Sequence, residues 1–194
     1  MAGGDQPFDE IQESLKRAAG ALREAEVPFL LGGGLAVWAK GGPPTGHDLD
    51  FMIKPEDADR ALEVLEAAGM RPEKPPEGWL YKAWDGDILV DLIFEPIGQP
   101  VDDEMFERAE KLEVQAVPML VMSLEDVMVA RLKALDEHSL DFERPLEFAR
   151  ALRERIDWEN VRQRTDDSPY AKAFFTMIEE LAIVEPAGSP SGRS

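Results

Sequence analysis

Cysteine and long apolar runs are both missing from this chain. The absence of cysteine excludes a disulfide framework, a thiolate zinc site and a cysteine nucleophile, and it fits a reducing compartment. No run approaches the roughly 18 apolar residues of a membrane span, and the first ten residues contain no basic segment leading into an apolar one. We therefore expect a cytoplasmic protein with no membrane partner.

Basic side chains are also scarce. Lys and Arg number 21 against 40 Asp and Glu, which gives a formal net charge of -19 among 194 residues. A surface this acidic repels the phosphate backbone of DNA or RNA, so nonspecific nucleic-acid binding is disfavoured. The charge promotes solubility and does not by itself identify a partner.

The hydrophobic pattern divides the chain into an α/β part and a helical part. The first part combines an amphipathic helix at 8–25, a strand leading into a glycine turn near 32–34, a strand around 48–53, a helix at 56–68 and a hairpin at 80–94 that turns at Asp85-Gly86. Residues 101–118 are ambiguous. The second part contains helices at about 123–135, 142–154, 157–165 and 168–184.

This pattern predicts three regions. Residues 1–118 should form an α/β core, residues 119–184 a helical C-terminal domain, and residues 185–194 a disordered tail, because the tail has no apolar periodicity.

Three aspartates stand out within the predicted strands. Asp48 and Asp50 lie two residues apart, so their side chains point to the same face of a strand and can hold one divalent cation between them. Asp91 interrupts the apolar strand ILV-D-LIF, where an ionised group is costly unless it lies on the polar face of the sheet or pairs with a metal. A third metal ligand on a neighbouring strand would explain Asp91.

The glycine turn is the second chemical signal. Gly32, Gly33 and Gly34 let the backbone approach a ligand closely, and a helix beginning at Leu35 would point unpaired N–H groups at a phosphate. A D-x-D pair or a triple glycine alone is weak evidence. Their occurrence together and in this order is much more specific.

The segments LLGGGLAVWAKGGPPTGHDLDFMI and ILVDLIFEP resemble the nucleotidyltransferase superfamily, which has a DNA polymerase beta-like fold. Within it the chain is most similar to small bacterial antibiotic nucleotidyltransferases and to AbiEii-like toxin nucleotidyltransferases, whose catalytic loop often has the pattern T-x-x-D-x-D, as in Thr45 to Asp50. The resemblance implies an α+β fold: a mixed sheet with flanking helices, followed by a C-terminal helical bundle.

The resemblance also implies a reaction and a site. It implies transfer of a nucleoside monophosphate from an NTP such as ATP to an acceptor hydroxyl, with two Mg²⁺ ions, or Mn²⁺ in their place, held by Asp48, Asp50 and Asp91. The nucleotide-binding residues that it implies are Gly32, Gly33, Gly34, Thr45, Arg131 and Lys133. Gly34 stands where many superfamily members have a serine that binds the terminal phosphate, so only its backbone N–H is available there.

The acceptor remains open at the level of sequence. A small molecule, for example an antibiotic, is favoured over a tRNA end or a protein hydroxyl in a toxin–antitoxin setting, because the chain is so acidic. A homodimer that completes the cleft is a further alternative. The competing functional class is a non-catalytic protein that binds a nucleotide or a partner, and the presence of all three aspartates favours the enzyme.

Overall fold

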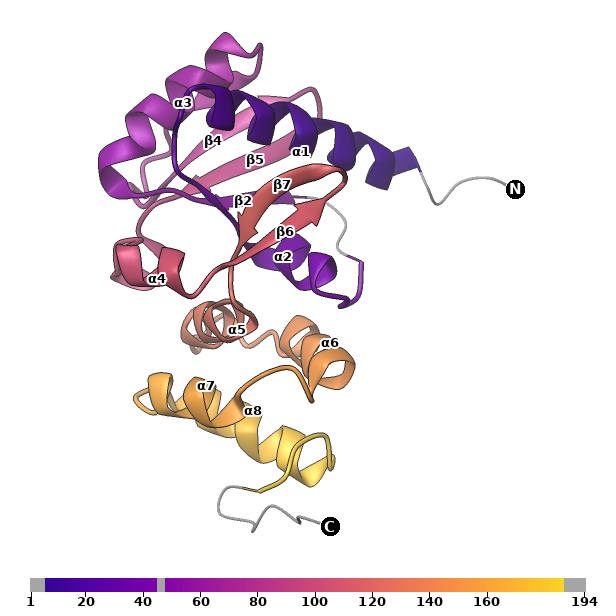
Figure 1. Ribbon diagram of the computed structural model, residues 1–194. Coiled ribbons are helices and arrows are strands. Elements are labelled where there is room, and N and C mark those ends of the chain that lie inside the picture. The colour runs from indigo at the N-terminus through magenta and orange to yellow at the C-terminus, as the bar shows by residue number, and fades with distance from the viewer. Residues whose placement is uncertain (1–5, 45–47, 187–194) are drawn as a thin grey trace. The chain divides into compact units, whose positions relative to one another are not determined.

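The computed structural model describes residues 6–44 and 48–186, and the chain divides into two compact units (Figure 1). The first unit comprises Met1–Lys40 and Pro44–Ser123, and the second comprises Gly41–Pro43 and Leu124–Ser194. The boundary expected after residue 118 falls within a strand, so the first unit extends a few residues beyond it.

A seven-stranded mixed sheet forms the centre of the first unit. Its strand order is β3-β4-β5-β2-β1-β7-β6. Two neighbouring pairs, β1–β7 and β2–β5, are parallel, and the other four are antiparallel. The strands are β1 (Leu30–Leu31), β2 (Asp48–Met52), β3 (Arg71–Glu73), β4 (Leu80–Asp85), β5 (Ile88–Ile93), β6 (Glu110–Val114) and β7 (Val117–Val121). This mixed sheet with flanking helices confirms the predicted α+β fold class.

Two amphipathic helices, α1 (Gln6–Glu24) and α3 (Ala58–Ala67), pack against each other and against one face of the sheet (Figure 1). Their apolar stripes supply fully buried side chains such as Leu15 and Leu65, as the spacing of three to four residues predicts. Asp85 at the end of β4 identifies the covered face, because its carboxylate accepts hydrogen bonds from Ser14 and Arg17 of α1.

The β4–β5 hairpin is confirmed, but its turn lies one residue later than predicted. Asp85 pairs with Ile88 inside the ladder, which leaves Gly86 and Asp87 as the two turn residues. Gly86 has a φ of 62°, the left-handed conformation that such turns require. Asp85 therefore belongs to the strand, where α1 binds its carboxylate.

The ambiguous region 101–118 forms a short helix and most of a hairpin. Helix α4 (Asp103–Glu107) precedes β6 and β7, which are joined by a two-residue turn at Gln115 and Ala116. Both turn residues have positive φ, 53° and 64°, although neither is glycine. The usual glycine or asparagine signal for such a turn is therefore missing from the sequence.

The second unit is helical, as predicted. Its helices are α5 (Leu124–Lys133), α6 (Glu143–Leu152), α7 (Trp158–Arg164) and α8 (Pro169–Glu180). Asp157 and Ser168 cap α7 and α8 by accepting hydrogen bonds from backbone N–H groups. Among the helices within residues 6–44 and 48–186, none combines the length and the apolar character that a membrane-spanning helix needs.

Phe51 in β2 offers a test of this core. Its side chain is fully buried and meets Phe29 edge to face, with ring centroids 5.1 Å apart. We expect Phe51→Ala to lower the free energy of unfolding by about 3–5 kcal/mol, because a cavity replaces the ring. Urea denaturation measures the loss.

The matched control is Leu181→Ala, since Leu181 is half exposed. It should change the free energy of unfolding by less than about 0.5 kcal/mol. Equal losses in the two variants would contradict the assignment of Phe51 to the core.

Candidate active site

The pairing of β2 with β5 places the three aspartates on one face of the sheet. In this parallel pair Asp50 lies directly opposite Asp91, and Asp48 lies opposite Leu89. Side chains two residues apart on a strand share a face, and so do side chains directly opposite each other on paired strands. The candidate active site therefore lies on the sheet face opposite the one that α1 covers.

The alternation of apolar and acidic residues fixes this register. Leu49 and Phe51 in β2, and Val90 and Leu92 in β5, have no exposed side-chain surface and point to the covered face. A slip of one residue would turn these side chains outward and bury aspartates in their place. The hydrophobic core thus forces the carboxylates to the opposite face.

The glycine turn lies against Asp50. The Gly32 N–H donates a 2.8 Å hydrogen bond to the backbone carbonyl of Asp50. Gly33 has a φ of 55°, and a Cβ atom at this position would lie 1.7 Å from the Asp50 carboxylate oxygen Oδ2. Only glycine fits there, because both the conformation and the space exclude a side chain. Gly33 and Gly34 begin the short helix α2 (Gly33–Ala39).

The Asp91 carboxylate is largely buried. Its side chain is 15% exposed, its Oδ1 atom has no hydrogen-bond partner, and the Lys82 ammonium lies 3.8 Å from that atom. The pKa of Asp91 is raised to about 6. Burial is the largest cause, the positive charge of Lys82 opposes the rise, and the negative charges of Asp48 and Glu73 add to it. An ionised Asp91 therefore lacks a full counter-charge.

The three aspartates supply the donor atoms that a divalent cation needs, although their side chains are not arranged around one point. Within residues 6–44 and 48–186, no three His, Cys, Asp or Glu side chains are arranged as a ready metal cluster. Three carboxylates on one face nevertheless supply the hard oxygen donors that Mg²⁺ prefers. The buried Asp91 oxygen without a hydrogen bond is an open ligand position. The chemistry of the donors thus fits a divalent cation.

Three more residues were predicted to bind the nucleotide. Thr45 is outside the described residues. Arg131 and Lys133 belong to α5 in the second unit, where Arg131 stacks over Phe148 and Lys133 pairs with Asp167 at 3.4 Å. Their role towards a nucleotide remains a prediction.

A row of charged side chains continues beyond the aspartates and was not predicted from the sequence. Lys82 in β4 lies opposite Asp91, and Glu73 in β3 lies opposite Lys82. The register of the β4–β5 hairpin determines which residue lies opposite Lys82. The predicted turn was one residue off, however, and a one-residue change in the turn moves Lys82 away from Asp91 in the ladder.

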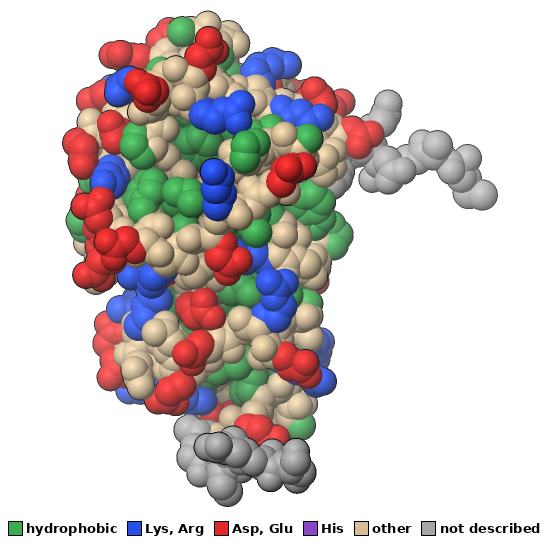
Figure 2. Space-filling model, viewed as in Figure 1, with side chains coloured by type: hydrophobic (Ala, Val, Ile, Leu, Met, Phe, Trp, Pro, Cys, Tyr) green, Lys and Arg blue, Asp and Glu red, His purple; other side chains and the backbone are tan. Residues whose placement is uncertain are grey.

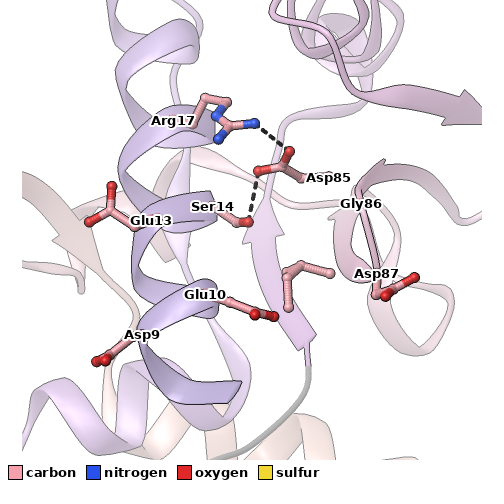
Figure 3. Close-up of a pocket in the computed structure, with 9 residues that line it drawn as sticks. Asp9, Glu10, Glu13, Ser14, Arg17, Asp85, Gly86 and Asp87 are labelled. Atoms are coloured by element: carbon pink, nitrogen blue, oxygen red, sulfur yellow. Dashed lines mark hydrogen bonds and ion pairs between the residues drawn. The ribbon is translucent and has the colours of Figure 1, made fainter. Parts of the chain in front are cut away.

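A pocket of about 490 Å³ lies on the other face of the sheet, between α1 and the β4–β5 turn (Figure 3). Acidic side chains surround it, and Arg17 and Ser14 both hold Asp85 at its side. Because Asp85 and Asp91 point to opposite faces, this pocket is separate from the three aspartates. Figure 2 likewise shows acidic side chains spread over the viewed surface with Lys and Arg among them.

The mixed sheet, the D-x-D strand, the third aspartate on its parallel neighbour and the glycine turn against Asp50 form the arrangement that the resemblance to nucleotidyltransferases implies. The chain belongs to the family described as uncharacterised nucleotidyltransferase, whose model matches residues 10–182. A comparison with curated protein sequences finds none that matches this chain.

Solved structures of other proteins share the fold. The solution structure of the antibiotic-resistance factor ANT(2'')-Ia has a TM-score of 0.62 at 16% identity, covering 90% of this chain and 97% of that one. The crystal structure of ANT(2'')-Ia with adenylyl-2''-tobramycin has a TM-score of 0.62 at 15% identity, covering 87% and 98%. JHP933 from Helicobacter pylori has a TM-score of 0.55 at 17% identity, covering 96% and 84%.

Gly33→Ala tests the close approach of the turn to Asp50. The added methyl group would collide with the carboxylate and strain a positive φ, so we expect a loss of about 1–3 kcal/mol in unfolding free energy. Gly20→Ala is the matched control, because Gly20 lies in α1 with open space around it. It should raise stability by about 0.5–1 kcal/mol. Thermal unfolding that changes equally in both variants would contradict this geometry.

Asp91→Asn tests the burial of the carboxylate in metal-free protein. The native state raises the pKa from 3.8 to about 6, so it binds more protons than the unfolded state between these values, and its stability falls as pH rises through this window. The variant lacks this loss and should be more stable than wild type at pH 7.5, by at most about 3 kcal/mol.

The difference should shrink as pH falls below about 4, where Asp91 is protonated in both states. Chemical denaturation at both pH values measures it. Asp87→Asn, at the exposed hairpin turn, removes the same charge as a control. An Asp91→Asn variant less stable than wild type at pH 7.5 would show that Asp91 is well compensated.

Proposed function

We propose that this nucleotidyltransferase moves a nucleoside monophosphate from an NTP to a hydroxyl group of a small-molecule acceptor. The observation that carries the proposal is the parallel register of β2 and β5, which sets Asp50 beside Asp91 with Asp48 on the same face. Three carboxylates that repel one another have a clear physical role when a divalent cation binds between them.

The three aspartates are the proposed Mg²⁺ ligands, and Mn²⁺ has the same oxygen preference. When bound, the metal would stabilise the charge on the phosphates and make an acceptor hydroxyl easier to deprotonate. Asp91 is also the proposed proton acceptor, because its carboxylate lies next to the other two acids that would hold the metal and the acceptor hydroxyl.

The glycine turn is proposed to bring the backbone close to the triphosphate. Gly33 has no side chain on the side of the Asp50 carboxylate, so a bound nucleotide meets no obstruction from it. Gly34 offers only backbone N–H in place of a serine hydroxyl. Thr45, Arg131 and Lys133 are further proposed phosphate contacts.

Two facts support a small, cationic acceptor. The chain carries a net charge of -19, which attracts cations and repels polynucleotides. It also shares its fold with ANT(2'')-Ia, which was solved in complex with adenylyl-2''-tobramycin. The acidic surface is the main argument for the acceptor class, and the structural likeness supports it.

Nucleotide binding gives the test that needs no knowledge of the acceptor. Each of the four NTPs is titrated by calorimetry into wild type, with and without Mg²⁺. We expect one NTP to bind in a metal-dependent manner and Asp50→Asn to weaken that binding at least about tenfold, because one cation ligand loses its charge. Asp87→Asn should bind like wild type, since Asp87 lies in the hairpin turn.

Absence of binding by all four NTPs would overturn the proposal. Binding that is unaffected by metal and by Asp50→Asn would indicate a nucleotide-binding protein without transfer activity. If one NTP binds as expected, the same nucleotide with a labelled α-phosphate can be used to screen acceptors, and a labelled acceptor product must appear.

A further inference from the structure

A row of four charged side chains crosses the sheet at right angles to the strands, on the face that carries the three aspartates. Glu73 lies opposite Lys82, Lys82 opposite Asp91, and Asp91 opposite Asp50, on β3, β4, β5 and β2 respectively. Directly opposite residues project from the same face with Cβ atoms about 4.5–5.5 Å apart. Lys82 thus has one acid on each side, and the acid on one side belongs to the proposed metal site.

Lys82 and Glu73 make different contacts with their neighbours. The Lys82 ammonium lies 3.8 Å from Asp91 Oδ1, beyond hydrogen-bonding distance, and the Lys82 side chain is 28% exposed. The Glu73 carboxylate accepts a 2.9 Å hydrogen bond from Trp84 Nε1 and lies 4.0 Å from the Arg71 guanidinium. Lys82 therefore only partly compensates the charge of the buried Asp91 carboxylate. A second acid, Glu73, lies on its other side.

We propose that Lys82 is a positioning residue whose ammonium is the resident counter-charge of Asp91 and competes with the divalent cation for it. In metal-free protein the ammonium offsets the buried charge of Asp91. When the cation binds, the ammonium leaves Asp91 and turns to Glu73. This inference rests on the proposed function, since it assumes that Asp91 ligates a metal.

The position of Lys82 on β4 suits this role. Asp50 and Asp91 are brought together by the core, so their repulsion is present whether or not a metal is bound. A lysine opposite Asp91 reduces this repulsion without occupying the space between Asp50 and Asp91. Its flexible stem also allows the ammonium to change partner, which a rigid guanidinium would do less readily.

The test compares Mn²⁺ binding to metal-free wild type and Lys82→Met, followed by electron paramagnetic resonance and calorimetry. Removing the competing ammonium should tighten Mn²⁺ binding about five- to tenfold, as expected for loss of one charge about 4 Å from a ligand. The same variant should have a lower melting temperature than wild type without metal, and the difference should shrink at saturating Mn²⁺.

Three variants serve as controls. Lys16→Met removes the same charge from an exposed pair with Glu13 on α1, so it should leave Mn²⁺ affinity unchanged. Lys82→Arg keeps a positive charge that changes partner less readily, so it should bind Mn²⁺ no more tightly than wild type. Lys82→Gln repeats the charge removal with a polar side chain, in case methionine disturbs the fold.

The outcomes separate this inference from the proposed function. Wild type that binds Mn²⁺, with Lys82→Met and Lys82→Gln binding it equally or more weakly, would overturn the role of Lys82 alone. Weaker NTP binding at unchanged Mn²⁺ affinity would show that Lys82 contacts the nucleotide instead. Failure of wild type and both variants to bind Mn²⁺ would overturn the proposed metal site and this inference together.

Discussion

The parallel pairing of β2 with β5 is the constraint on which the rest of the structure depends. It buries Leu49, Phe51 and their β5 neighbours against α1 and α3, and by strand alternation it brings Asp50 beside Asp91 on the opposite face. The stability of the core and the geometry of the site are therefore set by one register. A change that shifts the register would be resisted by the burial of several large apolar side chains.

The same register brings negatively charged carboxylates close together, and the neighbouring residues affect how these charges are accommodated. Asp91 is largely buried and close to other acids, which is why its pKa rises to about 6. Gly33 has no side chain, so the Asp50 carboxylate can occupy the space beside it. Lys82 supplies a positive charge near Asp91. Both residues lie next to the carboxylates, so both affect how the carboxylates are packed and charged.

Much of the site was predictable because its signals are local. The spacing of Asp48 and Asp50 fixes a common face on any strand, and an aspartate within ILV-D-LIF is conspicuous at any register. The charged row was harder to predict, since the position of Lys82 depends on a hairpin turn that lies one residue from the predicted one. The β6–β7 hairpin was missed because its turn residues, Gln115 and Ala116, adopt positive φ without glycine.

The sequence by itself determined the α+β class, the amphipathic helices and the identity of the three acids, because periodicity and composition report which faces are buried. Only the tertiary structure decided which strands are neighbours. β2 and β5 are separated in sequence by α3, β3 and β4, so no local pattern specifies that they pair, or that Asp50 and Asp91 meet. The solvation of Asp91 and the place of Lys82 beside it follow from that pairing, since both depend on the atoms that long-range contacts bring together.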